Sequence, residues 1–430
     1  MDRKQEYDAL MQELRQTPPA LEGTLDRALD RRRARRRKLR PLCSLAAAAA
    51  IFVLLVNVSI PFAQACAHIP VLGWLAQAVC FSHSLSSAVE HDWVQKVDQT
   101  QSDNGYTLTL EDLIVDQKQI HLFYTLDWED PACEYAMVLV DGERLSPRPS
   151  VLSDSVNGPQ DAGHIVLDYR EGQVPDRLDL GLTVRSNGDG APAARFRFQV
   201  TLDPALTAAG QIRPVEQWVE LDGQQIYVDR LEIYPTHARL MLRDHPDNTA
   251  RLVSLLCHLE DETGRRYERE GGLSGFSDPD TGFLTELRLS SPYFQQPEQL
   301  TLCITGAAWQ DPEEAEVTVD LTAGTAAGLP EEIRLTRVDE EPDRTVLYFQ
   351  SPVPSALLPQ HFSWTCRSPE GEWHVTEGGS GTDQDTGLET EDLHLIDYPW
   401  DQVTLTLNWT RFSPLDVSLP IPKAEQKGSF

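Results

Sequence analysis

Two acidic loops hold the residues of this 430-residue chain that are best suited to chemistry. Each loop reads Asp-x-Asp-Thr-Gly and is followed by a glutamate, and the carboxylates are Asp278, Asp280, Glu286, Asp383, Asp385 and Glu391. Such oxygens could bind Ca²⁺, but an EF-hand has a further ligand before its glycine and a glutamate about six residues after it, not four. Asx turns, each closed by a glycine with positive φ, explain the same residues. We predict no metal site and keep the six carboxylates as weak Ca²⁺ candidates.

No other group of residues forms a recognised catalytic pattern. The sequence has no G-x-S-x-G or H-E-x-x-H motif, and none of its seven cysteines forms a C-x-x-C pair. Cys257 and Cys303 either form a disulfide or remain buried free thiols. His258 follows Cys257 directly, but neighbours on a strand point to opposite faces, so this pair cannot act together. We therefore predict a protein that is not an enzyme and has no cofactor.

The charges are distributed very unevenly along the chain. Residues 1–40 contain 12 Lys/Arg and 7 Asp/Glu, which leaves 25 basic and 60 acidic residues for the rest. Two parts of such different charge are expected to face different environments. The acidic part would repel phosphates, which excludes non-specific binding of nucleic acid.

A membrane-spanning helix is predicted over residues 41–63, because no Asp, Glu, Lys or Arg occurs between Arg40 and Glu90. The 22 residues from Leu42 to Ala63 would extend about 33 Å as a helix, enough to cross a bilayer core of about 30 Å. The basic run Arg31–Arg40 should stay on the cytoplasmic side, which places the C-terminal part outside the cell. We predict a single-pass protein of the cell membrane with a cytoplasmic N-terminus.

Residues 64–94 are predicted to form an amphipathic juxtamembrane segment, anchored at the outer interface by Trp74 and Trp93. Two alternatives stay open. Ala63-Gln64-Ala65 before Cys66 resembles a signal-peptidase site, although a 40-residue tail is long for a signal peptide. Residues 69–89 could instead cross back as a helical hairpin, but this would leave the 60 acidic residues inside.

The cytoplasmic tail, residues 1–40, is predicted to be helical with two apolar stripes. The stripes consist of Tyr7, Leu10, Met11 and Leu14, then Leu21, Leu25 and Leu29, and Thr17-Pro18-Pro19 separates them. A segment this short cannot bury a core of its own. The stripes therefore indicate docking to a partner, and the alternative is a weakly ordered tail that lies on the membrane.

Three copies of one β unit follow the membrane segment. Apolar residues recur at offsets of 3, 5, 8, 10, 15, 17 and 19 from Gly105 and from Gly223, and less regularly from Pro330. Alternation with period 2 on both sides of a polar turn predicts strand pairs. Six or seven short strands in about 105 residues are typical of an immunoglobulin-like sandwich. We predict a mainly β protein with three such modules in series, at 95–205, 206–324 and 325–424, with residues 415–421 as the last strand of the third.

The N-terminal part resembles a family of Gram-positive bacterial single-pass membrane proteins of unknown function. The matching segments are 10–14, 17–18, 21–22, the arginine run, 52–59, 69–72, 84–86, 88–90 and 114–119, and residues 206–320 resemble the immunoglobulin-like module that often follows. Such proteins are often encoded beside extracytoplasmic-function sigma factors, so the resemblance implies an anti-sigma or sensor role. The tail lacks the His-x-x-x-Cys-x-x-Cys zinc motif of better-understood anti-sigma factors.

Two functions fit these features. The first is a membrane-anchored, non-enzymatic regulator or sensor whose outer modules bind an unknown extracellular or cell-wall ligand and whose tail binds a sigma factor. The second is a cell-surface adhesion or scaffold protein in which the tail is only an anchor.

Overall fold

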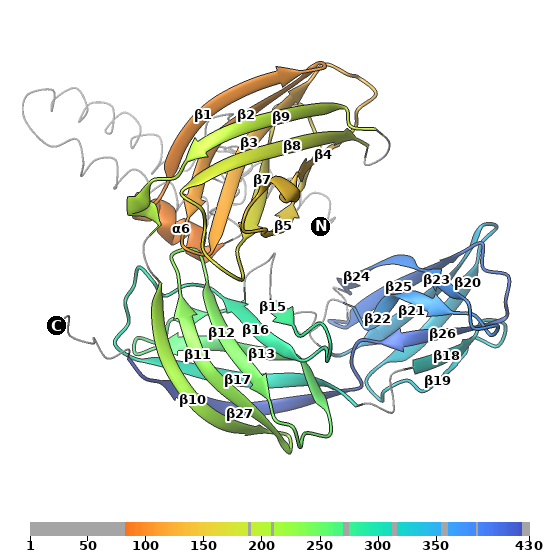
Figure 1. Ribbon diagram of the computed structural model, residues 1–430. Coiled ribbons are helices and arrows are strands. Elements are labelled where there is room, and N and C mark those ends of the chain that lie inside the picture. Colours follow the sequence, from red (N-terminus) through yellow and green to blue (C-terminus); the bar gives the residue numbers. More distant parts are fainter. Residues whose placement is uncertain are drawn as a thin grey trace, which may run out of the picture. The chain divides into compact units, whose positions relative to one another are not determined.

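The computed structural model describes residues 82–187, 191–207, 210–269, 275–311, 316–353, 360–383 and 386–423. Within these ranges the chain is mainly β, and its strands form six antiparallel sheets (Figure 1). The sheets contribute to three hydrophobic cores, which define sandwiches 1, 2 and 3. The prediction of a mainly β chain built from several β-sandwich-like units is confirmed.

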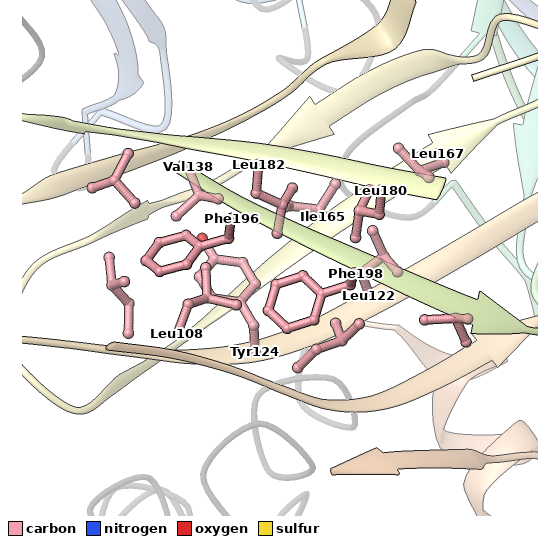
Figure 2. Close-up of a cluster of buried hydrophobic side chains, with 14 of the residues drawn as sticks. Leu108, Leu122, Tyr124, Val138, Ile165, Leu167, Leu180, Leu182, Phe196 and Phe198 are labelled. Atoms are coloured by element: carbon pink, nitrogen blue, oxygen red, sulfur yellow. The ribbon is translucent and has the colours of Figure 1, made fainter. Parts of the chain in front are cut away.

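Sandwich 1 contains a sheet with strand order β1-β2-β3-β7-β5 and a sheet with order β6-β4-β8-β9. Its elements are α6 (His83–Glu90), β1 (Gln95–Asp103), β2 (Tyr106–Val115), β3 (Gln119–Trp128), β4 (Ala136–Val140), η1 (Gly142–Arg144), β5 (Ser150–Ser153), β6 (Ser155–Val156), β7 (Asp161–Asp168), β8 (Arg177–Ser186), β9 (Ala194–Thr201) and η2 (Pro204–Leu206). Leu108, Tyr124 and Phe198 lie in the core between the two sheets (Figure 2). Burying such large apolar side chains is the main favourable term in folding.

Sandwiches 2 and 3 repeat this arrangement. Sandwich 2 has the sheets β10-β11-β12-β16-β15 and β14-β13-β17-β27, and sandwich 3 has the sheets β20-β21-β25-β24 and β19-β18-β26-β22-β23. The strands are β10 (Gln211–Leu221), β11 (Gln224–Ile233), β12 (Ala238–Asp244), β13 (Arg251–Asp261), β14 (Arg266–Tyr267), β15 (Gly275–Ser277), β16 (Leu284–Leu289), β17 (Leu300–Gln310), β18 (Glu316–Asp320), β19 (Thr325–Ala327), β20 (Arg334–Glu340), β21 (Arg344–Ser351), β22 (Phe362–Arg367), β23 (Trp373–Val375), β24 (Glu377–Thr382), β25 (Glu389–Ile396), β26 (Gln402–Leu407) and β27 (Arg411–Ile421).

The spacing of the sequence repeat has a direct structural cause. Asn104-Gly105 and Asp222-Gly223 have positive φ at both positions and close two-residue hairpin turns, as type I′ turns require. The step of three residues between offsets 5 and 8 falls on a bulge, after Leu110 in β2 and after Val228 in β11. A bulge adds one residue to a strand, so the apolar side chains on both sides of it face the same core.

Sandwiches 2 and 3 exchange their last strands. In sandwich 1, β9 pairs with β8, which directly precedes it. In sandwich 2, β17 pairs instead with β27 from the end of the chain, whereas β18, which follows β17, pairs with β26 of sandwich 3. Figure 1 shows β27, coloured blue as the last strand, beside the green and teal strands of sandwich 2. The structure thus differs from the linear division that the sequence predicted at residue 324.

The cores show the same exchange. Leu419 and Ile421 of β27 belong to the core of sandwich 2. Val317 and Val319 of β18 belong to the core of sandwich 3, although they precede the predicted boundary. Alternation along a strand determines which face is apolar, but it does not determine which sheet edge the strand joins.

The predicted membrane helix at 41–63 lies outside the described residues, as do the tail and Trp74. Among the residues that the structure describes, no helix combines the length and the apolar character needed to span a bilayer.

Asp112, beside the bulge of β2, is a carboxylate that the sequence analysis did not single out. It is 4% exposed, and within the described ranges its Oδ1 has no hydrogen-bond partner. Burial raises the pKa of Asp112 to about 6, and Lys96, its cross-strand neighbour, only partly opposes this effect. At neutral pH the buried charge therefore destabilises the folded state.

The variant Asp112→Asn should be more stable than the wild-type chain at pH 7.5, by up to about 2 kcal/mol in the free energy of unfolding after allowance for partial solvation. Since the pKa of Asp112 is higher in the folded than in the unfolded chain, the wild type gains stability as the pH falls through about 6. Thermal unfolding of both chains between about pH 4 and about pH 8 measures this effect. A difference that stays constant over the whole range would contradict it.

Candidate functional site between sandwiches 1 and 2

Helix α6 directly precedes β1 of sandwich 1 along the chain, and it packs against sandwich 2. Ser82 caps the helix by accepting a hydrogen bond from the backbone N–H of Leu85 at 3.1 Å. The residues from Ser84 to Val89 are buried. Ser84 Oγ accepts a hydrogen bond at 2.9 Å from the backbone N–H of Ser291, on the segment after β16. The end of the predicted juxtamembrane segment 64–94 therefore packs on protein, and residues 64–81 of that segment lie outside the described residues.

The residues just after α6 extend the contact to both sandwiches. The His91 ring stacks on Phe294 of sandwich 2, with ring centroids 4.5 Å apart. The Trp93 indole N–H donates to the carbonyl of Val115 in sandwich 1 at 2.8 Å, and its ring lies edge-on to Phe294. The polar group of the half-buried Trp93 ring is thus bonded inside the protein, and its role as a membrane anchor stays a prediction.

Asp116 lies at the centre of a polar cluster formed by two equivalent hairpin loops, the β2–β3 loop and the β11–β12 loop. Its Oδ1 accepts the backbone N–H groups of Lys118 at 2.7 Å and Gln119 at 2.8 Å. Its Oδ2 accepts the backbone N–H of Thr236 at 3.2 Å and also the hydroxyl of Thr236. His237 Nδ1 lies 3.5 Å from the same carboxylate.

The environment of Asp116 stabilises its charged form. Burial raises the pKa of Asp116, but the charge and hydrogen bond of His237, with the hydrogen bonds from Thr236 and Lys118, outweigh it and hold the pKa below the ordinary value. A carboxylate that accepts several hydrogen bonds stays ionised down to low pH. Asp116 is therefore a fixed negative charge that joins the two loops.

A chain of buried ion pairs forms a second link between the sandwiches. Arg288 of β16 donates to Asp168 of β7 at 2.7 Å and to Glu286 at 2.9 Å. Arg239 of β12 donates to the other oxygen of Glu286 at 2.6 Å and lies 3.5 Å from Glu232. Burial raises the pKa of Glu286, but the two arginines outweigh burial and hold its pKa below the usual range.

Two histidines beside this contact stay neutral near physiological pH. His121 Nδ1 lies 3.0 Å from His164 Nε2, and the rings stack. Burial lowers the pKa of His164 to about 4. Burial and the neighbouring His164 lower the pKa of His121 well below its usual value. These side chains therefore contribute packing and hydrogen bonds, and not a charge change near neutral pH.

The structure places the Ca²⁺ candidates in turns and in the protein interior. Asp278 Oδ1 accepts the backbone N–H groups of Asp280 and Thr281, and Gly282 has φ +73°. Glu286 is bonded to arginines, as described above. Asp383 accepts the N–H of Thr386 in the equivalent turn, and Glu391 accepts the N–H and ring nitrogen of His361. These four residues all have protein partners.

Asp280 lies in the Asp278 turn and donates its backbone N–H to Asp278. The other sequence-predicted site residues lie outside the described residues: Asp385, the stripe residues Tyr7, Leu10, Met11, Leu14, Leu21 and Leu25, and the membrane residues Arg31, Arg40, Leu42, Ala63 and Trp74. Local sequence pattern did not reveal the buried charges of this contact, because they come from five separate strands and loops: Asp116, Asp168, Glu232, Arg239 and Arg288. One signal was present: Asp116 and Gln119 fall in the segment 114–119, one of those that carry the family resemblance.

Comparison with protein families accounts for two parts of the chain. Residues 35–127 match a domain of unknown function (DUF4179), and residues 211–335 match a family of unknown function (DUF5643). The chain contains a DUF4179 domain and a DUF5643 domain. α6 and the Asp116 loop lie in the DUF4179 domain, whereas Thr236, Arg239, Glu286 and Arg288 lie in the DUF5643 domain. The contact of Asp116 with Thr236 therefore joins the two domains, whereas Asp168, the partner of Arg288, lies outside both matched segments.

Other comparisons add little. No curated protein matches the chain. A solved structure, described as the conserved domain protein from Bacillus anthracis, is 12% identical, with a TM-score of 0.38, and the match covers 51% of this chain and 79% of that one. The family resemblance stated from the sequence is thus confirmed at the level of the two domains, and the membrane and sigma-factor parts stay predictions.

Proposed function

We propose that this chain is a single-pass membrane protein that senses a condition of the cell envelope through outer immunoglobulin-like modules and regulates a sigma factor through its cytoplasmic tail. The observation that carries the proposal is the position of α6. This helix lies within the predicted juxtamembrane segment 64–94 and contacts sandwich 2 through Ser291, while Trp93 bonds to sandwich 1. A ligand that changes the contact between the DUF4179 and DUF5643 domains would therefore act directly on α6.

The chemistry of the contact also favours a regulatory role over catalysis. Its charged groups are bonded to one another: Asp116 to Thr236, Arg288 to Asp168, and Arg239 to Glu286. Buried ion pairs with fixed partners hold a defined geometry but lose several kcal/mol when one partner is removed. A contact of this kind supports two discrete arrangements, closed or separated, which a signal-transmitting element requires.

Co-purification of the full-length chain from membranes tests the proposed function. The wild type should recover a sigma factor, and Leu10→Glu combined with Leu14→Glu should reduce recovery at least tenfold, because two charges interrupt the apolar stripe. Gln12→Glu, outside that stripe, is the matched control and should bind normally. Recovery of no sigma factor by the wild type, or equal recovery by the Leu10/Leu14 variant, would overturn the proposal.

One observation favours the second candidate function, a surface adhesion protein. Strand β23, at the edge of its sheet, exposes Trp373 to 62% and Val375 to 74%. Exposed aromatic and apolar side chains on an edge strand are suited to binding another molecule. If the protein acts only by adhesion, the Leu10/Leu14 variant should behave as wild type in every phenotype, so the same experiment separates the two functions.

A further inference from the structure

The outer face of one sheet of sandwich 2 brings together three side chains with metal-binding groups. His258 and Glu260 lie two residues apart on β13 and therefore share a face, and His258 is the cross-strand partner of Cys303 on β17. A ring nitrogen of His258, a carboxylate oxygen of Glu260 and Cys303 Sγ all lie within 4.8 Å of one another. The sequence excluded joint action of His258 with its neighbour Cys257, and the sheet register shows that His258 lies opposite Cys303 instead.

The state of each side chain fits a ligand role. Within the described ranges, His258 Nε2 is shielded from solvent and has no hydrogen-bond partner, and it lies 3.8 Å from Glu260 Oε2. A buried imidazole nitrogen without a partner is costly unless something binds it. Cys303 is a free, partly exposed thiol. Arg266 approaches the same Glu260 oxygen only at 3.4 Å, which leaves the second carboxylate oxygen available.

We propose that His258, Glu260 and Cys303 bind one Zn²⁺ ion. Zinc is commonly bound by His nitrogen, Cys thiolate and carboxylate oxygen at about 2.0–2.3 Å, which places the ligand atoms of a tetrahedral site about 3.3–3.8 Å apart. Small side-chain rotations of His258, Glu260 and Cys303 bring their ligand atoms from within 4.8 Å to these separations. The thiolate selects zinc over Ca²⁺ or Mg²⁺, which prefer oxygen ligands. Three protein ligands leave the fourth position open for water or for a donor from another molecule.

The ion links strand β13 to strand β17. The three ligands lie on these two neighbouring strands. A thiol binds zinc as the thiolate, so uptake of Zn²⁺ releases a proton from Cys303. β17 is also the strand that pairs with the exchanged strand β27, and Cys303 itself lies opposite Ser418 of β27. Bound Zn²⁺ should therefore stabilise the sheet of sandwich 2 that holds the end of the chain.

Cobalt binding to the full-length chain, purified in detergent and stripped with a chelator, tests this inference independently of the proposed function. The wild type should bind one Co²⁺ with a near-ultraviolet thiolate-to-cobalt absorption band that Zn²⁺ abolishes by displacement. Cys303→Ser should lose this band, and His258→Gln and Glu260→Gln should each weaken binding by about 100-fold or more. Cys257→Ser, on the opposite face of β13, is the control and should retain it.

A second measurement keeps the test valid if a variant folds poorly. Zn²⁺ should slow alkylation of Cys303 at least tenfold in the wild type and have no such effect in His258→Gln, with modification of Cys303 followed by peptide mass analysis. A wild type that shows no thiolate-to-cobalt band, a band that persists in Cys303→Ser, or Cys303 alkylation that Zn²⁺ does not slow would each overturn the inference.

Discussion

The variant Arg288→Met should lower the free energy of unfolding of sandwich 2 by about 3–5 kcal/mol. Arg288 is 4% exposed and bonds to two carboxylates, Asp168 of sandwich 1 and Glu286 of sandwich 2. Removal of the guanidinium leaves the buried Asp168 carboxylate without its arginine and leaves Glu286 with Arg239 as its close partner, although methionine fills a similar volume. The loss should appear as faster amide hydrogen exchange in β12 and β16 and in α6, because the same contact holds sandwiches 1 and 2 together.

An exposed ion pair provides the matched control for Arg288. Arg197 donates to Asp179 at 2.5 Å, but both side chains are open to solvent, so Arg197→Met should leave hydrogen exchange nearly unchanged. Equal effects of the two substitutions would show that the buried ion pairs of Arg288 stabilise the contact between sandwiches 1 and 2 no more than an exposed pair does. A double variant in which Asp168 is also replaced by Asn should recover part of the loss, because it removes the carboxylate that Arg288→Met leaves uncompensated.

Low pH should weaken the same contact. The folded-state pKa values of Asp116 and Glu286 are held below their ordinary values, so the stability that these groups contribute is present above the unfolded-state pKa. It is lost as the pH falls through the folded-state values. This direction is opposite to that of Asp112, whose pKa is raised.

The exchanged strands predict a reciprocal pattern of damage from two core substitutions. Ile421→Ala should destabilise sandwich 2 by about 2–5 kcal/mol, because Ile421 is 3% exposed in the core of that sandwich. Val319→Ala, which precedes the predicted boundary at 324, should instead destabilise sandwich 3, to which its side chain belongs. Val→Ala removes less volume than Ile→Ala, so the second effect should be the smaller of the two.

Amide hydrogen exchange resolved by peptide measures both substitutions in the full-length chain. Ile421→Ala should increase exchange in β13 and β17, and Val319→Ala should increase it in β21, β25 and β26. The opposite assignment, with Ile421→Ala affecting β26 and Val319→Ala affecting β17, would mean that each sandwich keeps its own last strand. Leu347→Ala, in the core of sandwich 3 and on β21, which pairs with neither exchanged strand, is a control that should affect sandwich 3 only.

The strand repeat could be predicted from the local sequence pattern, whereas the buried ion pairs between sandwiches 1 and 2 could not. Ile226, Val228 and Leu231 were placed correctly on the core side because alternation and the Asp222-Gly223 turn act between neighbours along the chain. Asp168 and Arg288 are 120 residues apart in the sequence, and nothing in their immediate surroundings distinguishes them from surface charges. Only the packing of one sandwich against another removes them from water and pairs them.

The sequence by itself determined the mainly β character, the three β units, the turn residues and the apolar face of most repeat strands, since each depends on residues close together in the chain. Three features followed only from the tertiary structure: the sheet edges that β18 and β27 join, the charges buried between sandwiches 1 and 2, and the position of His258 opposite Cys303. Each of these three features depends on contacts between residues that are far apart in the chain. An edge strand offers the same row of donors and acceptors to any partner, so its neighbours follow from the complete arrangement of the chain.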